Sequence, residues 1–370
     1  MRRYELDWLR VFVFALLIFY HVGMFFVPWG FHIKNNTVYE WLVYPMLFLN
    51  QWRLPILFVI SGMGTYYALS KRNGFQFGWE RIRRLGLPLA VGMLLVVPPQ
   101  VYIERLAKKQ FEGSYFFDYW PSEAFIGVYP EGNLSWHHLW FLPYLLIFSL
   151  LLIPLFLFIR KHPQNKLTRL ARNLIRKPFG IFWLIIPLYL CEAFLEPFFN
   201  VTHALIDDWF NFISSMILFF YGFLLISVQE DFWESVVVNR RRYLGLGCIG
   251  ITVLMILIFG FKDSTVVHFT EALVKVFNLW SWILALFGYT AKYLNRSSKV
   301  LAYSNKAVYP FYILHQTVTL ILGYYLMDME WGFFSKFTIM VVGTFGFSWL
   351  IYEFGIRRWL WIRPLFGLKL

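Results

Sequence analysis

Long apolar stretches alternate with short, mostly basic segments along the whole 370-residue sequence. A transmembrane helix needs about 20 mainly apolar residues to cross roughly 30 Å of hydrocarbon. Ten stretches meet this requirement, which predicts an all-α, polytopic membrane protein. The predicted spans cover residues 8–28, 41–69, 85–103, 138–159, 179–199, 209–228, 243–261, 271–291, 307–327 and 333–355.

The distribution of basic residues predicts the orientation of these spans. Of the 34 Lys and Arg residues, 26 lie in the two terminal segments and alternate loops, and five lie in the remaining loops. Lys and Arg are enriched in the cytoplasmic loops of membrane proteins. We therefore predict cytoplasmic termini and a single transmembrane domain over residues 1–370, without a separate soluble domain. The first apolar run fills a whole span and is interpreted as a retained helix.

Composition argues against several other classes of protein. Apolar residues make up 59% of the chain and charged residues only 15%, whereas about one quarter of a soluble domain is charged. The net charge of +13 does not indicate a nucleic-acid partner, because the basic residues occupy short segments between spans. Cys191 and Cys248 lie in apolar spans without a CxxC spacing, so we expect neither a disulfide framework nor a metal site there.

In the first span, the otherwise apolar run RVFVFALLIFYH begins with one ionisable residue and ends with another. Helical geometry places Arg10 and His21 about 20° apart on one face and roughly 16 Å apart along the axis. Such groups are costly in a membrane and usually mark a functional site. A desolvated imidazole favours its neutral form, so His21 is a candidate general base, with Asp7 orienting Arg10. Alternatively, Arg10 anchors the helix and His21 bonds a neighbouring helix.

Arg53 is a second candidate, because it lies about 18 Å inside the second span if this helix starts near Trp41. A guanidinium at that depth must meet an anion, carbonyl groups or water. It would polarise a carbonyl group or bind an acidic group of a substrate. The structural alternative is an ion pair with Glu192 or Glu353.

Further candidates lie at the predicted ends of the spans. The sequence ERIRRLGLP contains Arg81 and Arg84, whose guanidinium groups suit phosphate binding but also fit simple positive-inside charge. In SWHHLWFLPYLL, His138 and Trp140 suit a sugar at the outer mouth or an interfacial belt. His315 is a second imidazole at mid-depth. No HxxxH or HExxH spacing accompanies these histidines, so we predict no metal site.

Together these motifs resemble the acyltransferase-3 family of integral membrane acyltransferases, and most of all its branch of glucan biosynthesis protein C succinyltransferases. The matching motifs, in the order of the family, are Arg10 with His21, FVISGM with Ser61, Arg81 with Arg84, HLWFL from His138, YPFYILH ending at His315, and the C-terminal YEFGIRR. The resemblance implies a ten-helix fold, an acyl-CoA donor substrate, no permanently bound cofactor and a hydroxyl acceptor outside the cytoplasm.

With this resemblance, we predict a multi-pass O-acyltransferase of the bacterial inner membrane, with membrane lipids among its partners. It would move an acetyl or succinyl group from cytoplasmic acyl-CoA to an extracytoplasmic glucan or other glycan. His21 would act as general base or carry the acyl group itself. The remaining predicted roles are catalysis by Arg10 and Arg53, donor binding by Arg10, Arg81 and Arg84, and an acceptor cavity lined by Ser61, His138, Trp140 and His315.

Another class of protein remains open at this point. A proton-coupled transporter would use His21 and His315 as a relay, with Arg53 as the counter-charge of the substrate. Transporters with two matched halves often show an internal repeat, and the sequence contains none that is apparent. A membrane scaffold fits the sequence least well, because it assigns no function to the polar residues within the spans.

Overall fold

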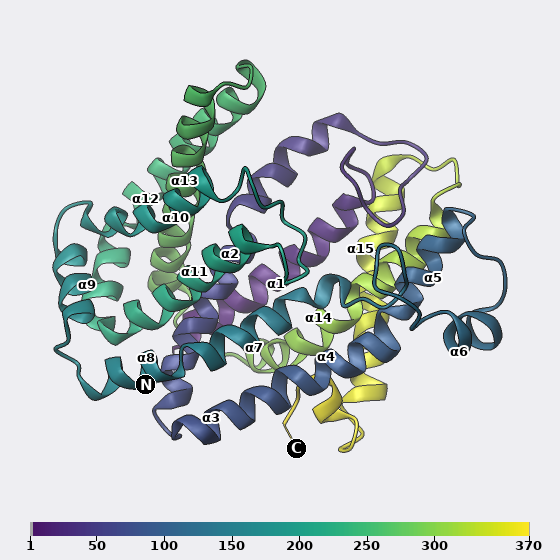
Figure 1. Cartoon of the computed structure of the whole chain (residues 1–370), viewed down its shortest axis with the longest axis horizontal. Helices are drawn as coiled ribbons and strands as arrows, with labels where there is room; N and C mark the ends of the chain where they lie inside the picture. The colour runs from purple at the N-terminus through teal and green to yellow at the C-terminus, as the bar shows by residue number, and fades with distance from the viewer. Residues whose placement is uncertain (1–2, 370) are drawn as a thin grey trace. The chain divides into compact units, whose positions relative to one another are not determined.

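The computed structural model describes residues 3–369 and confirms the all-α prediction for them (Figure 1). Within this range the extended pairing is an isolated bridge between Val128 and Leu134. Helices satisfy their own backbone hydrogen bonds, as a membrane requires. The helices are α1 Tyr4–Met24, α2 Val43–Leu69, α3 Gly74–Arg81, α4 Leu87–Val91, α5 Pro98–Ala107, α6 Trp120–Ser122, α7 Phe141–Leu151, α8 Ile153–Lys161, α9 Lys166–Arg176, α10 Ile185–Phe194, α11 Trp209–Ser227, α12 Gln229–Gly260, α13 Thr265–Tyr293, α14 Lys299–Leu326 and α15 Phe333–Leu350.

Seven helical segments of the described chain are long and apolar enough to cross a membrane, and α7 with α8 adds an eighth if this pair, bent by 51°, is one broken span. The chain is therefore a multi-pass membrane protein. Two of the ten predicted spans differ from this set. Residues 179–199 contain only the short apolar helix Gly180–Phe194, and α14 is long but carries His315, Gln316 and several tyrosines. The count of ten and the cytoplasmic termini stay predictions.

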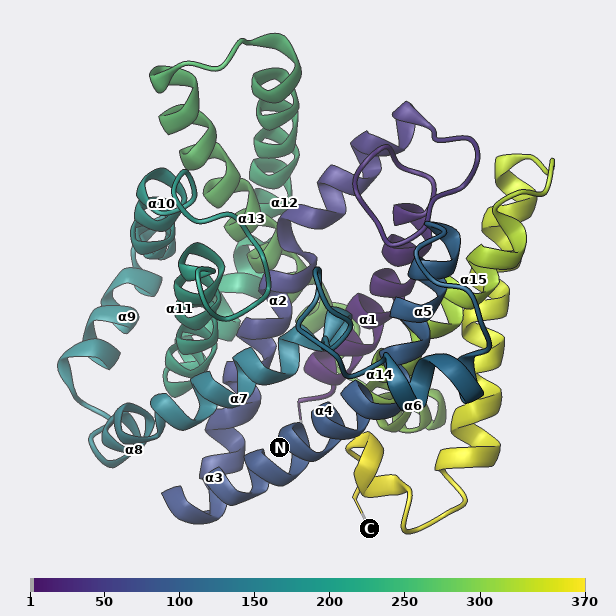
Figure 2. The same cartoon turned by 45° about the vertical axis from the view of Figure 1, so that its right-hand side comes forward.

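The chain forms two compact units. The first comprises the chain up to Val13, Leu47–Arg81 and Tyr144–Leu301. The second comprises Phe14–Met46, Ile82–Pro143 and the chain from Ala302 onward. In the first unit, α12 and α13 lie side by side as an antiparallel pair (Figure 2). The prediction of one domain over residues 1–370 stays a prediction.

In the first unit, α2 and α11 pack with their backbones in contact. A Cβ atom at Gly62 would lie 1.9 Å from the carbonyl oxygen of Phe219, and one at Gly222 would lie 1.9 Å from that of Val59. Glycine permits such a close approach between membrane helices. This contact fixes the part of α2 that contains Ser61.

In the second unit, a buried lysine holds the loop of residues 25–39 against α15. Lys336 is fully buried, and its Nζ donates to Asn35 Oδ1 at 2.7 Å and to the Met327 carbonyl oxygen at 3.2 Å. A buried ammonium is stable only where acceptors replace water around it. The loop that carries His32 is thereby fixed.

The close contact of α2 with α11 predicts that Gly62→Ala destabilises the protein by about 1–3 kcal/mol, the usual cost of overpacking a core. The added methyl group would meet a backbone oxygen, which cannot rotate away. Thermal unfolding of the purified protein in detergent measures the effect. Gly245→Ala in α12 is the control, since no atom lies within 4 Å of its Cβ position. Equal melting temperatures for the two variants would contradict the packing argument.

Candidate functional site

The second unit brings two of the predicted site residues into direct contact. His21 in α1 and His315 in α14 form a pair whose Nδ1 and Nε2 atoms are 2.7 Å apart. The two rings have an angle of 2° between their planes and centroids 4.9 Å apart. His315 is fully buried, whereas His21 is partly exposed. These residues, 294 positions apart in the sequence, are called the histidine pair below.

A backbone carbonyl group fixes the protons of the histidine pair. Nδ1 of His315 lies 2.7 Å from the carbonyl oxygen of Tyr312, which can only accept, so Nδ1 carries the hydrogen. In the neutral ring, Nε2 of His315 then holds the lone pair and accepts from Nδ1 of His21. The lone pair of a neutral His21 is therefore on Nε2. This orientation of one imidazole by a hydrogen bond to its other nitrogen is typical of functional histidines.

The hydrogen bond of the histidine pair also persists when His21 is protonated and positively charged. If Nε2 of His21 takes a proton, its Nδ1–H still points at the Nε2 lone pair of His315. The bond becomes charge-assisted, and such bonds are roughly twice as strong as neutral ones. His315 thus supports the protonated form of its partner without being an anion itself.

His138 is adjacent to His315 of the histidine pair and is only 7% exposed. Its ring centroid is 5.1 Å from that of His315. Its Nε2 donates to the carbonyl oxygen of Ile313 at 3.0 Å, and its Nδ1 accepts from Gln100 Nε2 at 3.3 Å. Trp140 is buried as well, at 8%. The contacts with an acceptor predicted for His138 and Trp140 stay predictions, and in this structure His138 positions α14.

A chain of polar side chains that the sequence analysis missed continues from His138. Gln100 Nε2 donates to Thr317 Oγ1 at 2.7 Å, and Gln100 Oε1 accepts from Gln316 Nε2 at 3.1 Å. Gln316 lies 3.2 Å from His32 Nε2, and His32 Nδ1 lies 2.7 Å from Glu104 Oε2. A single placement of the hydrogens satisfies every one of these bonds, and in it the proton of His32 is on Nδ1. The only sequence signal was the four-residue spacing of Gln100 and Glu104, which places both on one face of a helix.

His32, Glu104 and His137 are ligand types that zinc accepts, and their ligand atoms lie within 4.8 Å of one another. The carboxylate already has protein partners. Lys108 Nζ is 2.5 Å and Tyr129 OH 3.1 Å from Oε1 of Glu104. Burial and the Glu104 carboxylate raise the pKa of Tyr129 to about 12, so its hydroxyl keeps the proton that it donates. The predicted absence of a metal site stays a prediction.

In the first unit, two predicted arginines approach the same segment of α2. Arg81 Nη2 donates to Thr65 Oγ1 at 3.1 Å, and the Thr65 hydroxyl donates to the carbonyl oxygen of Ser61 at 2.9 Å. Arg10 Nη2 lies 4.0 Å from the Cβ position of Gly64. As expected, Arg10 is also close to Asp7, with 3.7 Å between Nη1 and Oδ1.

A third arginine, which the sequence analysis did not single out, reaches the next residue of α2. Arg160 Nη1 donates to the carbonyl oxygen of Tyr66 at 3.5 Å, and its guanidinium carbon lies 5.4 Å from the centre of the Tyr66 ring. Arg10, Arg81 and Arg160 come from α1, α3 and α8. These three are called the arginine cluster below.

The remaining predicted residues lie elsewhere in the two units. Arg53 is 2% exposed within α2 of the first unit. The acids considered as its structural partners have other partners, because Glu192 pairs with Lys275 at 3.2 Å and Glu353 with Arg357 at 2.7 Å. Arg84 belongs to the second unit and is exposed in the π segment Ile82–Gly86.

Comparison with known proteins adds a family to this geometry. Residues 3–353 match the family model described as "Acyltransferase domain". The proteins named "Glucans biosynthesis protein C" from Salmonella heidelberg, Salmonella typhi and Salmonella typhimurium are each 26% identical over 367 residues. The alignments cover 96% of this chain and 92% of each relative. No solved structure matches.

The bonds of Glu104 predict that Glu104→Gln destabilises the protein by at least about 1–3 kcal/mol, because His32 and Lys108 would lose a charged acceptor. Unfolding in detergent, followed by circular dichroism, measures the change. Glu112→Gln is the matched control, since Glu112 is exposed. A Glu104 variant as stable as this control would show that the carboxylate does not hold the loop and α5 together.

Proposed function

From the premise that this chain belongs to the acyltransferase family whose model it matches, we propose that it moves an acyl group from cytoplasmic acyl-CoA to a hydroxyl group of an extracytoplasmic glucan. The chain is an acyltransferase of the membrane, and the donor, the acceptor and the bacterial inner membrane as its location belong to the proposal. The observation that carries the proposal is the histidine pair, because its hydrogen bonds place a lone pair on a defined nitrogen of His21.

The proposed chemistry begins at Nε2 of His21. As general base, this nitrogen takes the proton of the acceptor hydroxyl group while the oxygen attacks the thioester carbon. The carbon–sulfur bond breaks, an ester forms, and the imidazolium returns the proton to the departing thiolate of coenzyme A. In the second route, Nε2 attacks the thioester carbon first, the carbon–sulfur bond breaks, and coenzyme A leaves as the thiolate from an acyl-imidazolium. The hydroxyl oxygen then attacks the acyl carbon, the bond to Nε2 breaks, and the freed Nε2 takes the hydroxyl proton and passes it to the thiolate. In both routes His315 accepts from Nδ1–H of His21 throughout.

The arginines supply what the donor requires. Coenzyme A carries several phosphate charges, and guanidinium groups bind phosphates through paired hydrogen bonds. The arginine cluster gathers such groups around residues 64–66 of α2, and we add Arg160 to the donor-binding residues predicted earlier, Arg10, Arg81 and Arg84. Arg53 would stabilise negative charge on the thioester oxygen or bind the carboxylate of a succinyl group.

The relatives support a carbohydrate acceptor, because they are named as proteins of glucan biosynthesis. In the proposal, His138 and Trp140 of the second unit contact the acceptor on its way to the histidine pair, and Ser61 of the first unit stays a predicted acceptor residue. Mass spectrometry of surface glycans from cells with and without the protein would identify both the acyl group and its acceptor from the lost mass increment.

The role of His21 predicts that His21→Ala lowers the rate of acyl transfer at least ~10²-fold, since general bases contribute about 10²–10⁴-fold. The assay follows label from radioactive acetyl-CoA or succinyl-CoA together with free coenzyme A. His162→Ala is the control, because this exposed imidazole bonds only locally to the carbonyl oxygen of Phe158. Near-normal transfer by the His21 variant would exclude this residue from the chemistry. Solute flux driven by a proton gradient without use of acyl-CoA would instead support a transporter.

Donor binding by the arginines predicts a different effect. Arg81→Gln with Arg84→Gln, and separately Arg160→Gln, should weaken acyl-CoA binding about 10-fold or more, because each removes a charged hydrogen bond. The maximal rate should change much less. Arg296→Gln removes an exposed cation of the first unit and should leave binding unchanged. Unchanged affinity for acyl-CoA in both the Arg81/Arg84 double variant and the Arg160 variant would refute the proposal that these arginines bind the phosphates of the donor.

A further inference from the structure

A cavity of about 520 Å³ lies in the first unit between the end of α9 and the first turns of α12. We propose that it binds the phosphate head group of an anionic membrane phospholipid. The inference does not rest on the proposed acyl transfer, and either can fail without the other. Its lining comes from the turn after α9, which contains Arg176, Lys177 and Phe179, and from residues 231–243 of α12.

The length of α12 places this cavity near the edge of the hydrocarbon. Its 32 residues extend about 48 Å at 1.5 Å per residue, well beyond roughly 30 Å of hydrocarbon. The residues of α12 after 242 are almost entirely apolar, whereas Glu230, Asp231, Glu234 and residues 240–242 are charged. The first part of the helix is therefore the part that extends beyond the hydrocarbon, and the cavity lies along it.

Helix α9 has the character of a helix that lies in the membrane interface. One face buries Thr168, Ala171 and Ile175 against the protein, while Lys166 and Arg169 are exposed. Basic amphipathic helices of this kind lie at the level of the lipid head groups. The carboxylate of Asp231 fastens α9 to α12 through two arginines, with 3.2 Å to Nε of Arg172 and 2.7 Å to Nε of Arg176.

The turn that follows α9 is held in one conformation. The Lys177 amide donates to the Leu174 carbonyl oxygen at 3.1 Å, and the Gly180 amide donates to the Lys177 carbonyl oxygen at 3.0 Å. Phe179 has a φ of 56°, although bulky residues rarely adopt positive φ. A Cβ atom at Gly180 would lie only 2.1 Å from the oxygen of Leu174. Such strain costs about 1–3 kcal/mol and concentrates at ligand-binding sites.

The charges around the cavity suit a single phosphate group. Asp231 is neutralised by its two arginines, and the other acidic residue of the lining is Glu234. Lys177 and Arg242 add two cations, and Arg242 Nη1 is positioned by a bond to Asn239 Oδ1 at 3.3 Å. The three basic side chains of the lining are Arg176, Lys177 and Arg242, and they face the two carboxylates of Asp231 and Glu234. Arg172 beside Asp231 adds a fourth positive charge, so an anion is needed for balance.

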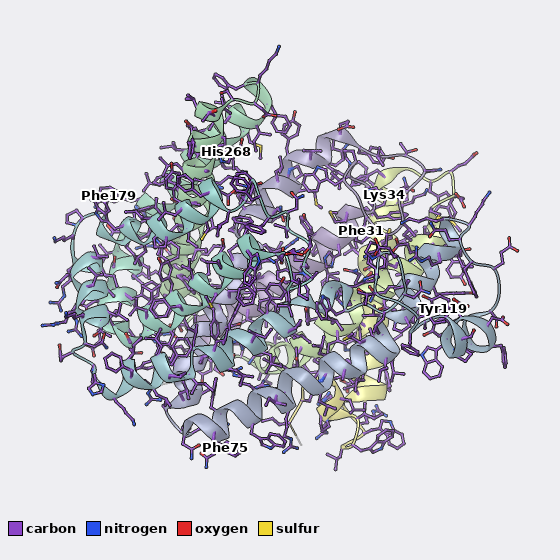
Figure 3. All side chains as sticks on the ribbon, viewed as in Figure 1. Phe31, Lys34, Phe75, Tyr119, Phe179 and His268 are labelled. Atoms are coloured by element: carbon purple, nitrogen blue, oxygen red, sulfur yellow. The ribbon has the colours of Figure 1, made fainter. Side chains whose placement is uncertain are left out.

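Apolar surface beside these cations favours a lipid over a soluble phosphate. Phe179 is 58% exposed and Val238 is 69% exposed, and both line the cavity. Figure 3 shows Phe179 at the outer edge of the first unit. Trp183 and Leu170 nearby in the sequence are exposed too. A phospholipid matches both features, because its phosphate meets Lys177 and Arg242 while its acyl chains cover the apolar residues.

The test measures lipid binding by native mass spectrometry of the full-length protein in detergent. We expect retention of dioleoylphosphatidylglycerol in preference to zwitterionic dioleoylphosphatidylcholine. Lys177→Gln with Arg242→Gln should weaken binding of the anionic lipid roughly 10- to 30-fold, the contribution of two basic residues near a membrane surface. Phe179→Asn should weaken it as well, because Asn tolerates the left-handed backbone but lacks the ring.

Lys166→Gln with Arg169→Gln is the matched control, since it removes the same charge from exposed positions that do not line the cavity. This control should bind the anionic lipid normally, and equal weakening by both pairs would overturn the proposal in favour of diffuse surface charge. Displacement of the lipid by adenosine 3′,5′-bisphosphate would also overturn it and assign the cavity to a soluble nucleotide. Thermal unfolding checks each variant, and if the double variant unfolds, the two single substitutions replace it.

Discussion

The hydrogen bond from His315 to the carbonyl oxygen of Tyr312 determines where the protons of the histidine pair lie. A carbonyl group can only accept, so this bond fixes one proton, and the tautomer of His21 follows across a distance of 2.7 Å. Tyr312 also donates its hydroxyl hydrogen to the carbonyl oxygen of His138 at 2.7 Å. Tyr312 in α14 therefore positions His315 through its carbonyl oxygen and His138 through its hydroxyl group. Its ring also contacts Phe14 of α1.

The remaining polar groups of the second unit agree with this arrangement. His138, Gln100, Gln316 and His32 form bonds in which each donor meets an acceptor, and the chain ends at the carboxylate of Glu104. A fully satisfied network is rigid, whereas one that is partly satisfied would be costly in a low dielectric. The network thus permits several polar side chains near the histidine pair without weakening the unit.

The sequence predicted features that depend on one helix and missed those that depend on several. Periodicity and hydropathy gave most of the spans, and helical spacing put Asp7 beside Arg10. His32 and Glu104 are 72 residues apart, and neither residue type nor local spacing indicates that they meet. Hydropathy likewise excluded α14 from the apolar helices, and three of its polar residues, His315, Gln316 and Thr319, are buried in the second unit. The sequence analysis did not single out Arg160 either, since its contact with Tyr66 joins residues that are 94 positions apart.

The two units contain different kinds of polar chemistry, and the proposed reaction needs both. Phosphate binding requires permanent cations, and the arginine cluster supplies them around a part of α2 that the contact with α11 holds rigid. Proton transfer from a hydroxyl group requires a neutral nitrogen, and the histidine pair supplies it through bonds to an uncharged carbonyl group rather than to a carboxylate. In the proposal, Nε2 of His21 is therefore the nitrogen that receives the substrate proton, while Nδ1–H stays bonded to His315.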